Sequence, residues 1–339
     1  MRGYDIVMGA GLVLAAAASV LCAGCASGPE ETMTQQVAVR EAHIESGRLS
    51  GRLLDNVANA GRQGSGFNPL CHTLYPGKSV YRLDFVGLNF EHIFNGAAGD
   101  KNISMFTPRK DPCKLLRESP RIASLTWPAE SSSWGIRCKM TYQFSPPNAI
   151  DLTFKATPTV DRFPHGYAAF MWASYMNRTR ERRIHFYGCN GGREGWMSFG
   201  DDLENGFETG TVPCAGIADL PYEEESQTLN LIEHPSKKFL KPFYYGLIDG
   251  DNDLTTADDT LAYIMMFDQA ESIRFALWNF IQDQEGRSDP HSPAWDWQYV
   301  IRSPEPGKAY GYRARVVVKP FAGREDVERE YSEWLASLS

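Results

Sequence analysis

The chain has 339 residues, of which 42% are hydrophobic and 12% aromatic, and its formal net charge is −8 at pH 7. This composition indicates a globular protein with a sizeable core. It argues against a nucleic-acid partner, because the sequence has no Lys/Arg-rich run that would neutralise phosphates. Small molecules, glycans and proteins remain as partners.

The N-terminus predicts export. An apolar stretch over residues 6–21 is shorter than the roughly 20 residues that span a bilayer, and small residues follow it. We therefore expect a cleaved signal peptide over residues 1–25. Gly24-Cys25 resembles the end of a lipobox, which implies lipid attachment at Cys25 and an extracytoplasmic protein anchored in the cell envelope, in the periplasm or at the outer membrane. Ordinary cleavage near Ala26 is the alternative.

Residues 26–66 are polar and contain scattered glycines, so we predict a tether there and a single domain over residues 67–339. No spacing of cysteines and histidines suggests a zinc site, and an oxidising compartment would allow at most two disulfides. The cysteines that remain after the signal and the lipidated residue are Cys71, Cys113, Cys138, Cys189 and Cys214.

The clearest strand covers residues 134–144, where apolar and polar side chains alternate without a slip. Pro146-Pro147-Asn148 predicts a turn, and alternation resumes over 150–156. These segments predict an antiparallel hairpin.

The same pattern recurs near the C-terminus over 295–301 and 310–318, with a turn between them, and predicts a second hairpin. Helical spacing is found in residues 324–338. We therefore expect an all-β fold with a C-terminal helix. A large antiparallel β-sandwich is favoured over a propeller, because no repeat of about 40 residues is present.

One short segment carries a family resemblance. Residues 172–177 (Trp-Ala-Ser-Tyr-Met-Asn) are similar to the Thr-His-Ser-Tyr-Phe-Asn strand end of galactose mutarotases, and residues 89–93 (Asn-Phe-Glu-His-Ile) near the domain start support it. The resemblance implies the β-supersandwich fold and sugar substrates. Ala173 occupies the position of the family's histidine, so the mutarotase acid–base machinery is not implied.

Adjacent acid and imidazole groups are the first candidates for chemistry. Glu91 and His92 are neighbours, and on a regular strand they would face opposite sides unless a bulge intervenes. Glu233 and His234 repeat the pairing. Histidine titrates near neutrality, and glutamate can transfer protons if its pKa is raised. A structural role in loops is the alternative for both pairs.

Other candidates belong to substrate binding. Arg109 and Lys110 lie in a loop between prolines and would suit a substrate carboxylate or sulfate, or would pair with neighbouring acids. Aromatic and hydrogen-bonding side chains that suit sugars gather from the 165–177 segment onward, although the tryptophan among them is as readily a core residue. We expect catalytic roles for His165 and Tyr175 and substrate contacts from Trp172, Asn177, His291 and Asp296.

The aspartates of the 249–253 segment concentrate the oxygen ligands that Ca²⁺ prefers. The spacing excludes an EF-hand, so a different calcium loop and a solvated acidic turn remain as alternatives. Calcium is the one cofactor that the sequence suggests, with Asp249, Asp251 and Asp253 as its ligands.

These features together favour an exported carbohydrate-active enzyme, a polysaccharide lyase or a glycoside hydrolase, that uses His, Glu and Tyr for acid–base chemistry. The sequence contains no serine-hydrolase, Walker, Rossmann or zincin motif. The alternative is a surface glycan-binding lipoprotein without catalysis.

Overall fold

A computed structural model describes residues 37–57, 64–75, 77–98, 105–204, 206–224, 231–250, 259–281, 286 and 289–338. Their strands and helices belong to the unit Gln35–Ser339. The predicted signal peptide and Cys25 lie outside the described residues. In this described part of the chain, no helix combines the length and the apolar character that crossing a membrane requires.

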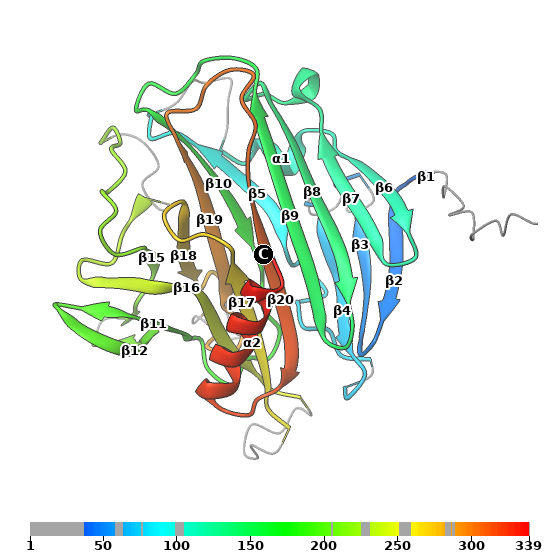
Figure 1. Cartoon of the computed structure of the whole chain (residues 1–339), viewed down its shortest axis with the longest axis vertical. Helices are drawn as coiled ribbons and strands as arrows, with labels where there is room; N and C mark the ends of the chain where they lie inside the picture. The colour runs from blue at the N-terminus through cyan, green and yellow to red at the C-terminus, as the bar shows by residue number, and fades with distance from the viewer. Residues whose placement is uncertain are drawn as a thin grey trace, which may run out of the picture. The chain divides into compact units, whose positions relative to one another are not determined.

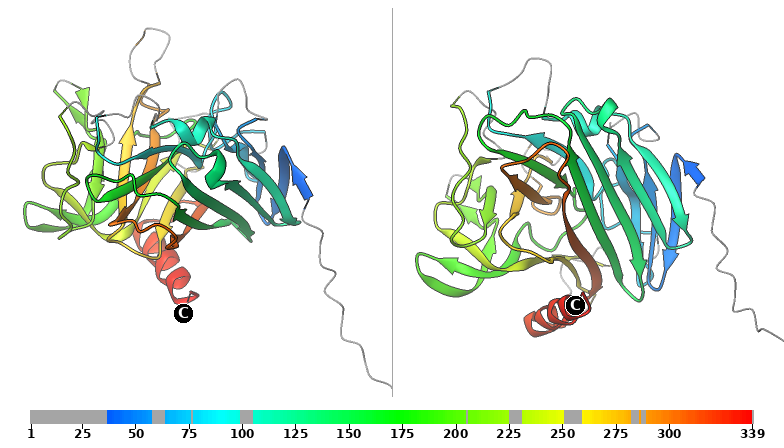
Figure 2. Two further views of the ribbon diagram at one scale, coloured as in Figure 1. Left: turned by 90° about the horizontal axis from the view of Figure 1, so that it is seen from above. Right: turned by 45° about the horizontal axis from the view of Figure 1, so that its top comes forward.

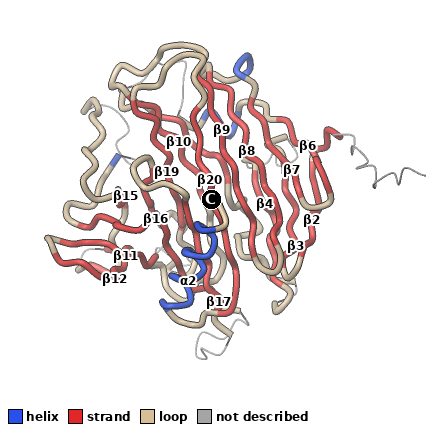
Figure 3. Tube along the Cα trace, in the orientation of Figure 1, coloured by secondary structure: helices blue, strands red, loops and turns tan. Residues whose placement is uncertain are grey.

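Antiparallel strands dominate the fold (Figures 1 and 3). Among the described residues, ten of them form one sheet, called the large sheet below. Its spatial order is β1 (Val37–Val39), β6 (Lys114–Ser119), β7 (Ile122–Trp127), β8 (Ile136–Ser145), β9 (Ala149–Pro158), β20 (Tyr310–Pro320), β17 (Leu261–Phe267), β16 (Lys237–Ile248), β11 (Ile184–Asn190) and β12 (Arg193–Phe199).

A second sheet of five described strands is called the small sheet. Its order is β15 (Gly210–Pro213), β18 (Ile273–Trp278), β19 (Ala294–Arg302), β10 (Tyr167–Ala173) and β5 (Asn89–Phe94). The remaining elements are short: β2 (Glu41–Ser46), β3 (Leu49–Leu54), β4 (Gly66–His72), β13 (Asp202–Leu203), β14 (Gly206–Phe207), α1 (Thr107–Lys110), a 3₁₀ turn (Ala129–Ser131) and α2 (Arg324–Ala336). The predicted all-β sandwich with a C-terminal helix is confirmed.

The first predicted hairpin is confirmed in register as well as in position. β8 and β9 pair from Ile136↔Pro158 to Ser145↔Ala149. Burial alternates along both strands, as the sequence pattern requires for strands with one face in a core.

The second predicted hairpin is wrong. β19 pairs with β18 and β10 in the small sheet, whereas β20 pairs with β17 and β9 in the large sheet. The two strands therefore face each other across the core, and Trp297 Nε1 donates a hydrogen bond to Tyr312 OH at 2.9 Å. The turn between them joins the two sheets.

The core lies between the two sheets. Trp172 of β10 and Trp297 of β19 stack with ring centroids 5.5 Å apart, and Phe154 of β9 packs edge-on against Trp172 at 4.7 Å. Helix α2 lies on the opposite face of the large sheet (Figure 2), and its Val327 and Trp334 are buried there. The helix predicted over 324–338 is thus confirmed, and its apolar side is what holds it to the sheet.

The predicted tether is wrong over part of its length. Residues 37–57 contribute β1 to the large sheet, and β2 and β3 to a three-stranded sheet with β4. Ile44 and Leu53 are fully buried, while the polar residues that alternate with them along β2 are exposed. The alternation of apolar and polar side chains, rather than the overall polarity of the segment, predicts its structure.

Candidate functional site

The outer face of the small sheet, which points away from the large sheet, carries the polar residues of the candidate site. Along β19, Trp295 and Trp297 belong to the main core, whereas Asp296 and Gln298, which alternate with them, face the other way. Both polar side chains are almost fully buried. Burying a polar group costs free energy unless it is hydrogen-bonded, so these buried side chains indicate a specific polar site on this face.

A β-bulge creates the centre of the site. In the pairing of β5 with β10, His92 lies opposite Met171 and Phe90 lies opposite Trp172, so Glu91 is the extra residue. The bulge brings the two neighbouring side chains to one side, with Glu91 Oε1 3.8 Å from His92 Nε2. The sequence analysis required a bulge for Glu91 and His92 to face the same side, and the structure contains this bulge.

Among the described residues, three side chains donate hydrogen bonds to the Glu91 carboxylate. Arg109 Nη1 lies 2.9 Å from Oε1, Tyr175 OH lies 3.2 Å from Oε1, and Asn89 Nδ2 lies 3.2 Å from Oε2. The short helix α1, which the sequence did not predict, positions the guanidinium. Glu91, His92, Arg109 and Tyr175, four predicted site residues from distant parts of the chain, thus meet around one carboxylate.

The electrostatics of this cluster follow from burial. The Glu91 side chain is 4% exposed, and desolvation raises its pKa even though Arg109 opposes the shift. Burial and the adjacent carboxylate raise the pKa of Tyr175 well above its usual range. Glu91 is therefore a carboxyl that can hold a proton at a higher pH than usual, and Tyr175 is a hydrogen-bond donor rather than a base.

A second buried carboxyl borders the first. Asp296 is 1% exposed, and its Oδ1 accepts a hydrogen bond from the backbone N–H of Ser174 at 2.9 Å. Burial raises its pKa well above the ordinary 3.8, and the negative charge of Glu91 adds to the shift. Asp296 thus fixes the backbone next to Tyr175. We call Asn89, Glu91, His92, Arg109, Tyr175 and Asp296 the Glu91 site.

Two partly exposed aromatic rings border this site. Phe85 stacks on Tyr175 with centroids 4.4 Å apart, and Phe106 meets His92 edge-on at 4.4 Å. Aromatic faces of this kind suit the apolar faces of sugar rings. The sequence analysis missed both phenylalanines and Asn89, since only the fold brings them to the carboxylate.

Several predicted residues lie elsewhere. Trp172 is fully buried in the main core, which corrects its predicted substrate contact. His165 pairs with Glu223 at 3.2 Å on a different loop, and Lys110 is exposed beside the site without joining it. Asn177 and His291 line a neighbouring cleft.

The second predicted acid–imidazole pair is divided between separate ion pairs. Glu233 Oε1 accepts from Arg274 Nη2 at 2.8 Å, and His234 Nε2 lies 3.1 Å from Glu208 Oε1. Burial raises the pKa of Glu233 and lowers that of His234. These contacts hold the 231–236 segment on the small sheet and do not bring the two side chains to the Glu91 site.

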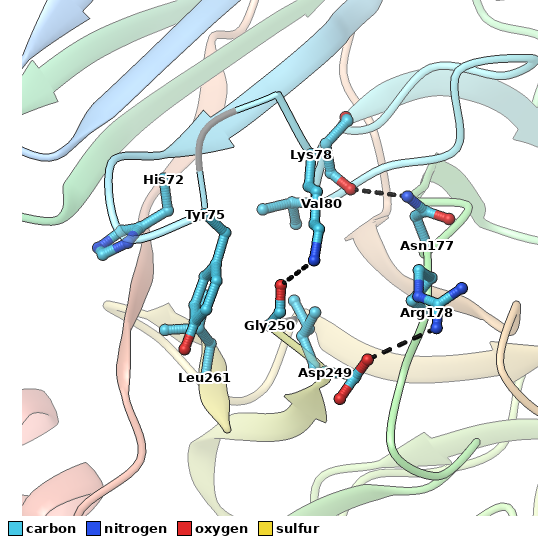
Figure 4. A pocket seen from close by; sticks show the side chains of 11 residues that line it. His72, Tyr75, Lys78, Val80, Asn177, Arg178, Asp249, Gly250 and Leu261 are labelled. Carbon is cyan, nitrogen blue, oxygen red and sulfur yellow. Dashed lines mark hydrogen bonds and ion pairs between the residues drawn. The ribbon is translucent and has the colours of Figure 1, made fainter. Parts of the chain in front are cut away.

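The predicted calcium loop is described only at its first residue. The buried Asp249 carboxylate lies 3.7 Å from Arg178 Nη2 (Figure 4) and 3.2 Å from Arg180 Nη2, so two guanidinium groups balance its charge. Asp251 and Asp253 lie outside the described residues. Within the described ranges, no cluster of three or more His, Cys, Asp or Glu side chains is placed to hold a metal ion.

The fold and the site together define a large β-sandwich that carries a buried acid cluster on the outer face of its smaller sheet. No protein-family model matches the sequence. No curated protein matches it either.

Solved structures similar to this chain include the proteins that the sequence resembles. A putative aldose 1-epimerase from Escherichia coli K12 is 12% identical over 83% of this chain and 99% of its own, with a TM-score of 0.43. A galactose mutarotase-like protein from Lactobacillus casei is 8% identical over 82% and 100%, with a TM-score of 0.45. A 4-alpha-glucanotransferase from Thermococcus litoralis is 7% identical over 84% and 39%, with a TM-score of 0.40. At these values the likeness carries no conclusion about activity.

Proposed function

We propose that the chain is a carbohydrate-active enzyme that works by proton transfer at the Glu91 site. The observation that carries the proposal is the Glu91 carboxyl, buried, raised in pKa, and in reach of an imidazole, a phenol and a guanidinium. Perturbed carboxyls with specific partners gather at catalytic sites. The partly exposed rings of Phe85 and Phe106 beside it would pack against a sugar.

The proposed roles follow from the contacts. Glu91 delivers a proton to the leaving oxygen of a glycosidic bond, because a raised pKa keeps the acid form available. A water molecule attacks the anomeric carbon as the bond breaks, and His92 accepts the proton that the water loses. His92 exchanges protons with Glu91, and Arg109 orients the carboxylate. Tyr175 is a positioning residue that donates a hydrogen bond to Glu91.

Hydrolysis fits these groups better than elimination. Glycoside hydrolysis requires a proton donor at the leaving oxygen, and Glu91, whose pKa is raised by burial, is such a group. Elimination requires a base that removes a proton from carbon, and a tyrosine held protonated is poorly suited to that task. We therefore place a glycoside hydrolase ahead of a polysaccharide lyase.

A glycan-binding protein without catalysis is the second candidate. It is favoured by the three hydrogen bonds that fix Glu91, since a carboxylate so engaged also serves as a rigid support for the loop carrying Arg109. The Phe85–Tyr175 stack would then be the sugar platform.

The test is a polysaccharide panel incubated with the protein lacking residues 1–25, with reducing ends and unsaturated-product absorbance measured together. New reducing ends without unsaturated products support hydrolysis, and both signals together support a lyase. Binding without either signal supports the glycan-binding candidate. A panel without turnover or binding contradicts both.

We further propose that the chain is exported and anchored by lipid at Cys25. The apolar stretch at 6–21 and Gly24-Cys25 support this proposal. An extracytoplasmic location would give the Glu91 site access to glycans of the envelope or the surroundings.

A further inference from the structure

A second hollow adjoins the Glu91 site. It is a cleft of about 280 Å³ lined by Arg82, Asn177, Arg178, Asp289, His291 and Ser292. The backbone connects this cleft to the Glu91 site. The Arg82 backbone N–H donates a hydrogen bond to the carbonyl of Tyr175 at 3.0 Å, and Asn177, which lines the cleft, lies two residues after Tyr175. The cleft opens to solvent and has room for a sugar ring.

The side chains that line this cleft are held in place. Arg82 makes two hydrogen bonds to Asp84, at 2.9 and 3.0 Å, and a third to Ser292 Oγ at 3.1 Å. His291 Nδ1 donates to the carbonyl of Thr179 at 2.6 Å, so Nε2 of the neutral ring is an acceptor. Preorganised groups of this kind lose little entropy when they bind a ligand.

Arg178 occupies a backbone conformation that side chains rarely adopt. Its φ is +57°, in the left-handed region, where a residue other than glycine is strained. Its side chain remains 40% exposed and reaches toward the buried Asp249, with Nη2 3.7 Å from Oδ2 (Figure 4). Backbone strain at a residue that lines a cleft is a feature of ligand sites.

The charges around the cleft are balanced. Arg82 is paired with Asp84, Arg178 faces Asp249, and Asp289 adds a carboxylate that accepts a hydrogen bond from the backbone N–H of His291 at 2.9 Å. An anionic ligand would therefore meet carboxylates as well as cations. The same lining offers both donors and acceptors, which matches sugar hydroxyls, since each of these donates one hydrogen bond and accepts others.

We propose that this cleft is a second sugar subsite, which binds a neutral sugar residue next to the one held at the Glu91 site. The inference rests on the proposed function and makes it more specific. The substrate class is then a neutral oligosaccharide or polysaccharide, bound across at least two residues, rather than a free monosaccharide.

The test measures binding by calorimetry against chain length. The probes are malto-, cello-, manno- and xylo-oligosaccharides of one to six residues, with oligogalacturonides as the acidic counterpart. We expect one neutral series to gain at least tenfold in affinity between one and two residues. Equal affinity at all lengths contradicts the subsite alone, and tighter binding of the acidic series contradicts the neutral class. No binding at any length contradicts the proposed function, and the subsite fails with it.

Two variants test whether the gain in affinity for a two-residue probe comes from this cleft. Arg178→Gly suits the left-handed backbone and removes the guanidinium from the cleft, and His291→Ala removes the imidazole. Each should return the affinity for a two-residue probe to that for one residue. Ser303→Gly is the matched control, because Ser303 has a φ of +49° and does not line the cleft. Unchanged two-residue binding in both cleft variants, with native melting curves, overturns the inference.

Discussion

Replacing Glu91 by Gln tests whether the buried carboxyl is a proton donor or a structural support. The substitution keeps the shape of the side chain and removes its charge and its proton. Breaking a buried ion pair costs about 3–5 kcal/mol when the remaining partner stays buried. Here the remaining partner, Arg109, is 24% exposed and can be hydrated, and the cost of burying Glu91 is removed. We expect a loss of about 1–2 kcal/mol in the free energy of unfolding.

The expected loss of rate is larger. A positioned general acid contributes about 10²–10⁴-fold, which corresponds to about 3–5 kcal/mol in the activation barrier. The assay therefore combines urea unfolding with initial rates on the glycan that the panel identifies. Arg109→Gln breaks the same ion pair but leaves the buried carboxyl without its cation, so it should lower the free energy of unfolding by more, about 3–5 kcal/mol, and keep more of the rate.

Glu118→Gln serves as a control away from the site, because Glu118 forms a more exposed ion pair with Lys139 at 2.9 Å. Its stability should change by no more than about 1 kcal/mol, with an unchanged rate. A rate in Glu91→Gln within tenfold of the wild type, together with a folded protein, would refute the acid role and leave Glu91 as a support.

Three further outcomes are expected. Burial raises the pKa of Asp296 in the folded protein, so the contribution of this group to stability is full below about pH 3.8 and is lost as the pH rises from that value toward the folded pKa. Asp296→Asn should therefore weaken the fall in melting temperature over that pH range, and superimposable pH profiles would contradict this. If Asp251 and Asp253 bind calcium, saturating calcium should raise the melting temperature relative to chelator, and identical curves would leave an acidic turn. Cys25→Ser should abolish lipid labelling and membrane partitioning, and retention of both would remove the lipoprotein proposal.

The sequence was sufficient for strands whose two faces differ. Along β8 the buried Ile136 and Met140 alternate with partly or fully exposed residues, so periodicity alone predicts the strand. Periodicity does not predict which strands pair with each other. β19 and β20 have the alternation of a hairpin, but the pattern is equally satisfied when each pairs in a different sheet. Contacts such as Trp297 with Tyr312 decide between the two, and these are not local in sequence.

The candidate site was predicted in its residues more than in its geometry. Glu91, His92, Arg109, Tyr175 and Asp296 were selected by chemical type, and the fold places them together. The bulge that aligns the first two is a one-residue shift against the partner strand, which one strand's sequence does not reveal. Strand β2 within the predicted tether was detectable in principle, because the buried Ala42 and Ile44 alternate with exposed polar residues.

The position of β20 has a consequence for how the molecule is made. In the large sheet, β20 lies between β9 and β17, so the strands from the first half of the chain meet those from the second half only through the last strand to be synthesised. A growing chain can therefore complete β6 to β9 early, but it cannot close the sheet until Tyr310–Pro320 is available. The two edges that wait for this strand are open to wrong pairing until then. A protein translocated before its C-terminus folds would close this sheet only at its destination.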